Sequence, residues 1–225
     1  MKWMFAGISE KNLRPTNMDS LFAAERRING TEVLLAAVCD GVGSQADGAF
    51  AAAFATESLE SWFCAQTSTE GMAPALRERI LRINHEIVLQ AQRQRLAAAS
   101  TLTALLLLDG RYTALCAGDS RIYALDRTDV QQLTCDDATE DGKLTEYLGR
   151  AGAVRVQYLE GEAAQRGFLL CTDGFYKRMP QELLPRAAGA RRRDELDRLL
   201  AEMSRTVKQR GERDNISAVI IKTKG

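Results

Sequence analysis

Short apolar runs bounded by polar turn residues recur along most of the 225-residue chain and predict β-strands. The clearest are Val33–Cys39 (VLLAAVC), which runs into Asp40-Gly41, and Gly167–Thr172 (GFLLCT), which runs into Asp173-Gly174. The complete set of predicted strands is Trp3–Ile8, Val33–Cys39, Thr101–Leu108, Arg111–Ala117, Arg121–Leu125, Val154–Leu159, Gly167–Thr172 and Ile216–Lys222.

Apolar residues at helical spacing predict helices between the strands. In Pro74–Ala97, Leu76, Ile80, Ile83 and Ile87 recur at steps of four and three residues and so share one face. The strands cluster around two adjacent early helices and one late helix, with hairpins between neighbours. This arrangement predicts an α+β fold of antiparallel sheets covered by helices, and not alternating βαβ units. The predicted helices are Asp47–Ala65, Pro74–Ala97 and Arg191–Gln209.

Composition predicts a single domain, residues 1–225, because 45% hydrophobic residues can bury a substantial core and no low-complexity linker divides the chain. The net charge is zero, with 30 basic and 30 acidic residues, which argues against nucleic acid as a partner. The one basic run, Arg191-Arg192-Arg193, is followed by Asp194 and Glu195 and is interpreted as the solvated start of a helix.

Targeting signals and cysteine chemistry add little. No apolar stretch approaches the 18 residues of a membrane span, and Met1–Ile8 is too short for a signal peptide, so we expect a cytoplasmic protein without membrane partners. The five cysteines form no CxxC pair, and three of them lie in apolar strand runs. They are interpreted as reduced packing residues.

The candidate chemistry lies in five aspartates at strand edges or in tight polar turns: Asp19, Asp40, Asp119, Asp173 and Asp214. Carboxylates gathered from distant segments repel one another unless cations lie between them, which is the pattern of a site for hard metal ions. Gly41 and Gly174 allow the chain to turn sharply after two of these aspartates. A third Asp-Gly pair, Asp109-Gly110, lies between two strand runs and is interpreted as a hairpin loop without chemistry.

The order of motifs resembles that of the metal-dependent serine/threonine protein phosphatases of type 2C (PPM), in the form of a compact bacterial-type catalytic domain. The resemblance spans nearly the whole chain, and its strength lies in the order of the motifs, each of which is weak alone. The matching pieces are Arg14-Pro-Thr-Asn17-Met18-Asp19-Ser20, Asp40-Gly41-Val42-Gly43-Ser44 with Gly48, Ser100-Thr101, Gly118-Asp119-Ser120-Arg121, Leu133-Thr134, Leu148-Gly149, Cys171-Thr172-Asp173-Gly174 and Asp214-Asn215-Ile216-Ser217.

The resemblance implies a four-layer α-β-β-α sandwich of two antiparallel sheets flanked by helices. It also implies two divalent cations, manganese or magnesium, with a water activated between them to attack phosphorus. In this resemblance Asp40 would bind both cations, the Gly41 carbonyl would bind one of them, and Asp173 and Asp214 would bind the other. Asp119 would bind a weaker third metal together with Asp173, and Arg14 would bind the substrate phosphate. Asp19 would accept a hydrogen bond from metal-bound water, and Asn215 would orient Asp214.

Other phosphatase chemistries fit the sequence poorly. A cysteine phosphatase needs a thiolate and an arginine at a fixed spacing in one phosphate-binding loop. The spacing from Cys116 to Arg121 is one residue too short, and that from Cys171 to Arg178 is one residue too long. An aspartyl-phosphate enzyme would carry a second aspartate two residues after the first, but the residue at that spacing from Asp40 is Val42. The single histidine, His85, lies inside a predicted helix and is interpreted as an ordinary helix residue.

Several positions depart from the family pattern without removing an implied ligand. Met18 stands where the family usually has an acidic or amide residue. Ser44 and Ser100 each stand where it usually has glycine. Val42 stands where some relatives carry a histidine proposed as general acid. The segment 135–147 corresponds to a longer flap in the family, and Asp137 occupies the usual place of a histidine in it.

The sequence therefore predicts a metal-dependent phosphatase acting on phosphoserine and phosphothreonine in proteins, with phosphorylated targets of a cognate kinase, or the kinase itself, as partners. One alternative is a catalytically silent relative that binds a phosphoprotein. The other is a general hydrolase of small phosphate esters.

Overall fold

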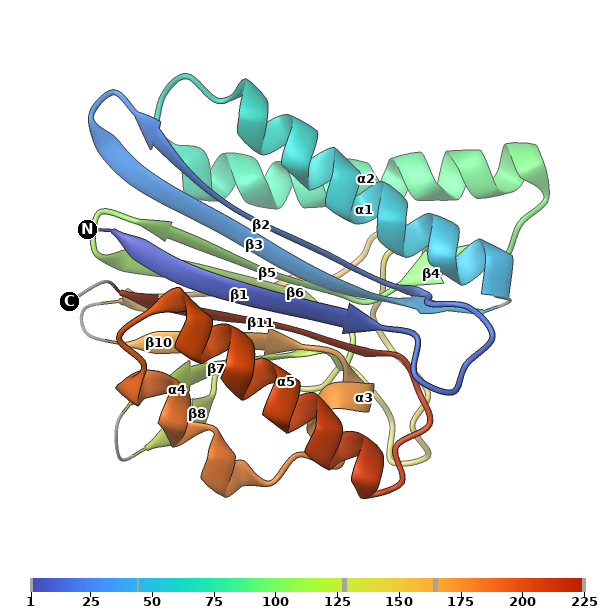
Figure 1. Ribbon diagram of the computed structural model, residues 1–225. Helices are drawn as coiled ribbons and strands as arrows, with labels where there is room; N and C mark the ends of the chain where they lie inside the picture. Colours follow the sequence, from blue (N-terminus) through green and yellow to red (C-terminus); the bar gives the residue numbers. More distant parts are fainter. Residues whose placement is uncertain (1, 44, 127–128, 164–165, 224–225) are drawn as a thin grey trace.

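Two antiparallel β-sheets packed face to face lie between two layers of helices, as Figure 1 shows. The structure is a computed structural model that describes residues 2–43, 45–126, 129–163 and 166–223; Ser44, part of one of the matching motifs, lies outside them. One sheet has five strands in the order β1-β11-β10-β7-β8. The other has the path β2-β3-β5-β6-β9. The four-layer α-β-β-α sandwich is therefore confirmed.

Three of the strand pairs, β2-β3, β5-β6 and β7-β8, are hairpins with short connections, and the other pairs join strands that are further apart in the chain. In chain order the elements are β1 (Trp3–Glu10), β2 (Asp19–Ile28), β3 (Thr31–Val42), α1 (Gln45–Ala65), α2 (Met72–Gln94), β4 (Ala99–Ser100), β5 (Leu102–Leu108), β6 (Arg111–Ala117), β7 (Arg121–Leu125), β8 (Val130–Gln132), β9 (Gln157–Glu162), β10 (Gly167–Cys171), α3 (Asp173–Tyr176), a 3-10 turn (Gln181–Leu183), α4 (Pro185–Gly189), α5 (Arg193–Gln209) and β11 (Ile216–Thr223).

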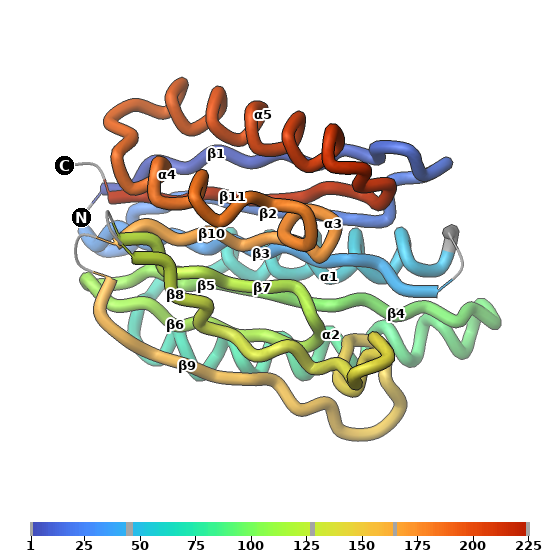
Figure 2. The backbone as a smooth tube through the Cα atoms, turned by 90° about the horizontal axis from the view of Figure 1, so that it is seen from below, coloured from blue at the N-terminus to red at the C-terminus, as the bar shows by residue number. Residues whose placement is uncertain are grey.

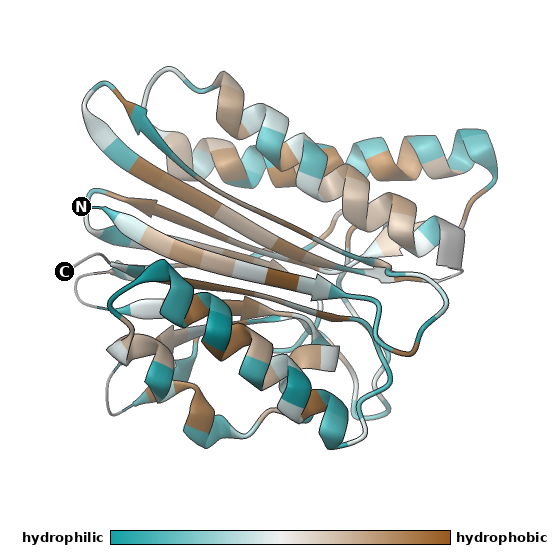
Figure 3. Ribbon diagram, in the orientation of Figure 1, coloured by the Kyte–Doolittle hydropathy of each residue, from teal (hydrophilic) through white to brown (hydrophobic). Residues whose placement is uncertain are grey.

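Three apolar layers hold the four structural layers together, and their strands are among the most hydrophobic parts of the ribbon in Figure 3. The central strand β3 shows why. Odd-numbered residues of Val33–Cys39 pack toward α1 and α2, and even-numbered residues pack against the five-stranded sheet. A strand buried on both faces has no polar alternation, which accounts for the unbroken apolar run in the sequence.

Local turn chemistry is confirmed at the hairpin between β5 and β6. Leu108 pairs with Arg111, and Asp109 and Gly110 both have positive φ angles, of 50° and 74°. Two successive residues of positive φ form the type I′ turn that matches strand twist. Asp109-Gly110 is therefore a hairpin loop, as the sequence predicts.

Several elements differ from the sequence prediction. Strand β2 was not predicted, because Glu25, Arg26 and Arg27 interrupt its apolar run. Asp19–Ile28 is an edge strand, and such charges are usual on an exposed sheet edge. Strand β9 begins and ends three residues later than predicted. The short β4, β8, α3 and α4 and the 3-10 turn were also missed, since elements of two to five residues leave no periodic signal.

Helix boundaries also need correction. Helix α2 begins at Met72 and ends at Gln94, before the predicted Ala97, because Arg95 adopts the left-handed conformation with a φ of 57° and its N–H bonds to the Ala91 carbonyl. Such a residue closes a helix. Helix α1 begins at Gln45 and α5 at Arg193, each two residues from its predicted start.

Candidate active site

Asp19 and Asp40 face each other across the first hairpin of the six-stranded sheet. Their Cα atoms are direct partners in the antiparallel register of β2 and β3. Directly opposed residues project from the same face of a sheet with their Cα atoms roughly 4.5–5.5 Å apart. Two like charges in this position destabilise the sheet unless a proton or a cation lies between them.

The main chain of Asp40 is fixed on both sides by one threonine. The Asp40 N–H donates to Thr101 Oγ1 at 2.9 Å, and the Thr101 N–H donates to the Asp40 carbonyl at 2.8 Å. Ser100, which stands where the family has glycine, adds a bond from Oγ to the Asp40 carbonyl at 3.1 Å. The serine therefore strengthens this junction, and Thr101 has a structural role that the sequence alone did not assign.

Gly41 lies where helix α1 meets the end of β3. A Cβ atom on Gly41 would come within 2.3 Å of the Gly48 carbonyl oxygen, and one on Gly48 would come within 2.8 Å of the Gly41 carbonyl carbon. Only two glycines allow the two backbones to approach so closely. The Asp-Gly pair thus ends the strand against a helix and leaves no side chain over the Gly41 carbonyl.

Asp173 and Asp214 come from the five-stranded sheet, at the end of β10 and just before β11. Thr172 joins the two sheets at this point, because its hydroxyl donates to Asp19 Oδ2 at 3.0 Å while its N–H donates to the Ser217 carbonyl at 3.0 Å. Sequence analysis missed this threonine, whose only local signal is its place directly before Asp173. The loop between β1 and β2, the strand β4 and the helix α3 lie toward the same end of the sandwich (Figures 1 and 2).

Asn215 ties the loop between β1 and β2 to the start of β11. Its side-chain amide donates to the carbonyls of Lys11 and Thr16 at 2.9 and 3.0 Å, and its Oδ1 accepts from the Met18 N–H at 2.9 Å. Its own N–H donates to Asp214 Oδ1 at 2.8 Å. The predicted relation between Asn215 and Asp214 is thus a backbone contact, and the amide itself shapes the loop that carries Arg14.

Arg14 forms a bidentate ion pair with Asp214. Nε donates to Oδ1 at 2.9 Å and Nη2 donates to Oδ2 at 2.7 Å. The two side chains remain 53% and 33% exposed, so the pair lies at the mouth of the acidic cluster. The residue predicted to hold phosphate therefore contacts a residue predicted to hold metal.

Asp119 and Lys177 are further charged residues near the cluster. Asp119 lies in the turn between β6 and β7, beside Gly118, whose φ is 116° and whose position is packed against Thr101. Lys177 follows α3 and places its Nζ 2.5 Å from Asp173 Oδ2. Lys177 is not among the predicted site residues, although its spacing of four residues from Asp173 is that of a same-face helical pair.

The carboxyl groups perturb one another strongly. Burial raises the pKa of Asp19 to about 7. The hydroxyls of Ser217 and Thr172 oppose this rise, and the charges of Asp173 and Asp214 add smaller increases. Burial and the neighbouring carboxylates Asp19 and Asp173 raise the pKa of Asp40 well above its usual value. Burial and Asp173 also raise the pKa of Asp119, to about 6. Such mutual shifts mean that the aspartates predicted from distant segments do lie near one another.

Asp214 behaves differently from the rest of the cluster. Burial raises the pKa of its carboxyl, but the hydrogen bonds from Arg14 and from the Asn215 N–H outweigh burial, and the net pKa is lowered. Its negative charge is therefore held by a basic partner, whereas among the residues that the structure describes no ion pair involves Asp19 or Asp40.

The cluster suits hard cations by one specific observation. Within the described residues, Oδ1 of Asp19 is buried and accepts no hydrogen bond. A buried, unpaired carboxylate oxygen costs more than about 1–3 kcal/mol, and a cation or a proton removes that cost. All donors of the set are oxygens, as Mg²⁺ and Mn²⁺ prefer.

The ligands are not yet arranged around a single point. Across residues 2–43, 45–126, 129–163 and 166–223, no group of three or more His, Cys, Asp or Glu side chains forms a ready metal site. In this arrangement Asp214 contacts Arg14 and Asp173 contacts Lys177. Cation binding would require these carboxylates to share or exchange their basic partners.

The segment 135–147 folds into a small loop closed on itself, with a bridge between Ala138 and Leu144. Asp137, at the usual histidine position, is buried and fixes this loop to the turn that carries Asp119. Its N–H donates to the Gly118 carbonyl at 2.9 Å, and its carboxylate accepts from Arg155 at 2.7 Å and Gln157 at 2.8 Å. Asp137 is thus a structural anchor.

His85 lies apart from the cluster. It is exposed on α2, in agreement with its interpretation as an ordinary helix residue.

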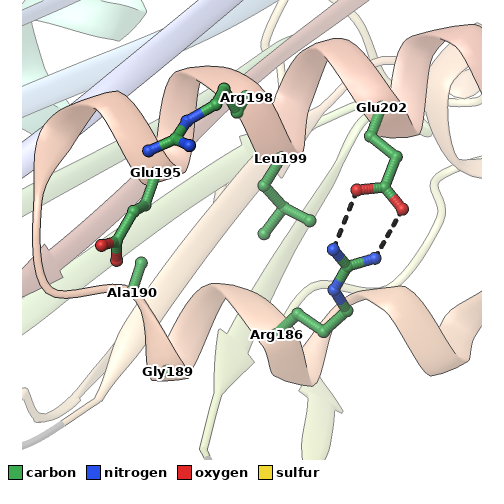
Figure 4. A pocket seen from close by; sticks show the side chains of 7 residues that line it. All are labelled: Arg186, Gly189, Ala190, Glu195, Arg198, Leu199 and Glu202. Atoms are coloured by element: carbon green, nitrogen blue, oxygen red, sulfur yellow. Dashed lines mark hydrogen bonds and ion pairs between the residues drawn. The ribbon is translucent and has the colours of Figure 1, made fainter.

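A groove of about 400 Å³ also lies apart from the cluster, between α4 and α5, as Figure 4 shows. Two of its charged residues, Arg186 and Glu202, form an ion pair with hydrogen bonds of 2.6 and 2.8 Å.

Two facing antiparallel sheets between helix pairs, with the motif aspartates gathered at one end, are the architecture of the PPM phosphatases. The chain belongs to the Protein phosphatase 2C family, whose model it matches over residues 16–220. Comparison with curated proteins gave no match.

Solved structures show the same fold. The serine/threonine phosphatase PstP/Ppp of Mycobacterium tuberculosis is 23% identical with a TM-score of 0.84, covering 99% of each chain. The catalytic domain of PstP in complex with two manganese ions is 24% identical with a TM-score of 0.83, covering 98% of this chain and 97% of that one. PppA, a regulatory component of type VI secretion in Pseudomonas aeruginosa, is 20% identical with a TM-score of 0.83, covering 99% of this chain and 98% of its own.

Proposed function

We propose that this protein is a single-domain metal-dependent phosphatase that removes phosphate from phosphoserine and phosphothreonine in proteins. The observation that carries the proposal is the convergence of Asp40, Asp173 and Asp214 with the buried, unpaired Asp19 at one end of the sandwich. Family membership supports the reaction class, and the manganese in the PstP structure supports the choice of cation.

The ligand set proposed for two divalent cations is Asp40, the Gly41 carbonyl, Asp173 and Asp214. When bound, such a pair activates water for attack on phosphorus and neutralises charge on the phosphoryl oxygens. The chain's own contribution is to hold these oxygens in place. Thr101 locks the main chain of Asp40, and Thr172 holds Asp19 against the opposite sheet.

Arg14 is proposed to bind the phosphoryl group of the substrate. A guanidinium has five N–H donors, and its contact with Asp214 uses one from Nε and one from Nη2. The remaining donors, two of them on Nη1, are available to phosphate while the contact with Asp214 persists. Asn215 supports this role by fixing the loop on which Arg14 lies.

Phosphorylated proteins are the proposed substrates, and a cognate serine/threonine kinase or its targets are the proposed partners. A cytoplasmic location is part of the same proposal. Among the helices of the described chain, none is long and apolar enough to cross a membrane.

The test is turnover of a phosphothreonine peptide by purified protein stripped with chelator and then titrated with Mn²⁺. We expect no phosphate release in excess chelator and full recovery with Mn²⁺. Release in excess chelator would contradict the two-metal mechanism. Parallel assays with para-nitrophenyl phosphate and with peptide binding distinguish the alternatives: preference for the small ester indicates a general hydrolase, and binding without turnover indicates a silent relative.

A further inference from the structure

Lys177 places a positive charge directly on a predicted metal ligand. Its Nζ lies 2.5 Å from Asp173 Oδ2, and the Asp173 side chain is only 17% exposed. The contact engages one of the two carboxylate oxygens. The other is the oxygen that a cation held with Asp40 and Asp214 would contact.

The backbone makes this contact a fixed property of the fold. Helix α3 begins at Asp173, and the N–H of Lys177 donates to the Asp173 carbonyl at 3.0 Å, which closes one helical turn. Residues four apart on a helix lie on one face, and an acid preceding a base at this spacing is the favourable order. The ammonium is therefore tethered within reach of Asp173 whatever else binds there.

A second carboxylate faces the same ammonium. Cys171 of β10 pairs with Arg121 of β7 in antiparallel register. Asp119, two positions before Arg121, therefore lies beside Asp173, two positions after Cys171 and in contact with Lys177. The lysine thus neutralises the region that Asp119 and Asp173 share.

We propose that the ammonium of Lys177 serves as a built-in cation between Asp119 and Asp173, where the family resemblance implies a weaker third metal. This inference rests on the proposed function for the other two cations. A tethered ammonium costs less ordering entropy than an ion recruited from solution, so it holds Asp173 in position at any metal concentration. It also repels a divalent cation from the same place.

Charge balance is consistent with this arrangement. The five aspartates carry five negative charges, and Arg14 and Lys177 offset two of them. Two divalent cations then bring the site close to neutrality with a small positive excess, which suits a phosphoryl dianion. A third divalent ion beside Lys177 would add like charge without a further carboxylate to hold it.

The experiment is a count of bound Mn²⁺ per chain, with free Mn²⁺ measured by electron paramagnetic resonance up to millimolar concentration. We expect Lys177→Met to bind one Mn²⁺ more than the parent protein, and Lys177→Met combined with Asp119→Asn to lose that extra ion. Lys177→Arg, which keeps the charge, should not gain an ion. Arg178→Met removes a positive charge from the neighbouring, exposed residue and is the matched control, expected to leave the count unchanged.

An unchanged count in Lys177→Met, or an extra ion in Arg178→Met as well, would overturn the proposal. Because the count is independent of turnover, its failure is distinguishable from failure of the proposed function. A protein that binds Mn²⁺ as expected but releases no phosphate would retain the role of Lys177 and lose the enzymatic proposal. If the parent protein releases phosphate normally but Lys177→Met gains no ion, the enzymatic proposal would stand and the proposed role of Lys177 would be lost.

Discussion

Arg14 and Asp214, separated by 200 positions in the chain, meet in a bidentate ion pair with N–O distances of 2.9 and 2.7 Å. The pair joins the loop after β1 to the turn that precedes β11, and Asn215 holds the same two segments together. The proposed phosphate-binding side chain and a proposed metal ligand are therefore coupled.

This coupling predicts opposite effects of one substitution on substrate and on metal. Arg14→Ala removes a charge-assisted contact worth roughly 1.5–3 kcal/mol to the phosphoryl group, so kcat/KM should fall about ten- to a hundredfold. It also removes a competing cation from Asp214, so Mn²⁺ should bind about two- to fivefold more tightly, as expected for a half-exposed pair.

Phosphopeptide kinetics and a manganese titration on the same protein check both effects. Arg27→Ala, an exposed arginine at the far end of β2, is the control and should change neither quantity. If Arg14→Ala left kcat/KM unchanged, the phosphate would be held without this arginine.

Asp40 and Asp214 should differ in their effects on stability although both are proposed ligands. Asp40→Asn removes an anion whose neighbours are mainly other carboxylates, so the Tm of the metal-free protein should rise. Asp214→Asn instead removes the partner of Arg14, so the Tm should stay level or fall slightly. Both variants should lose phosphopeptide turnover.

Thermal unfolding in chelator, followed by activity at saturating Mn²⁺, separates these effects. Near-normal turnover in either variant would remove that residue from the site. Equal changes in Tm would mean that the ion pair with Arg14 does not distinguish the two aspartates.

The acidic cluster should make the metal-free fold less stable as pH rises. The pKa of Asp19 is raised to about 7 and that of Asp119 to about 6 in the folded chain. An acid with a raised folded pKa binds more protons when folded, so its stabilising contribution is complete below the unfolded pKa near 4 and is lost as pH rises through the folded value. The lowered pKa of Asp214 acts at lower pH, outside this window.

We therefore expect the Tm in chelator to fall between about pH 4 and about pH 7, with a shallower fall in Asp19→Asn. Saturating Mn²⁺ should also flatten the curve, because bound cations replace the protons. A metal-free Tm that rose steadily through this window would show that the cluster does not control the pH dependence.

Asp137 should control the order of the segment 135–147. Its buried carboxylate accepts from Arg155 and Gln157, and its N–H holds the Gly118 carbonyl. Asp137→Ala leaves the side chains of Arg155 and Gln157 without this acceptor, at a cost of roughly 1–3 kcal/mol, whereas the backbone bond to Gly118 remains. Peptides covering 135–147 should then exchange backbone hydrogen faster.

Hydrogen exchange with mass spectrometry measures this effect. Asp141→Ala is the matched control, since Asp141 lies in the same segment with its side chain 59% exposed and contacts only local partners. Equal protection of the segment in the Asp137→Ala variant and the parent protein would mean that the bridge between Ala138 and Leu144 suffices to hold it.

The sequence was sufficient where local chemistry decides the structure. The strand β3 was predictable because both of its faces are buried. The hairpin at Asp109-Gly110 was predictable because its turn needs two residues of positive φ, and an Asp-Gly pair adopts that conformation readily. The order of motifs likewise pointed to the family and to the aspartates that the fold gathers.

Only the tertiary structure decided how those residues meet. The edge strand β2 is stabilised by pairing with β3, not by its own composition, and that pairing sets Asp19 opposite Asp40. The contact of Arg14 with Asp214 spans 200 positions, and that of Lys177 with Asp173 depends on a helix of four residues, too short to leave a periodic signal. The pairing of β2 with β3 and of β1 with β11 creates the first two contacts, because it brings charges together from segments whose local preferences carry no record of one another.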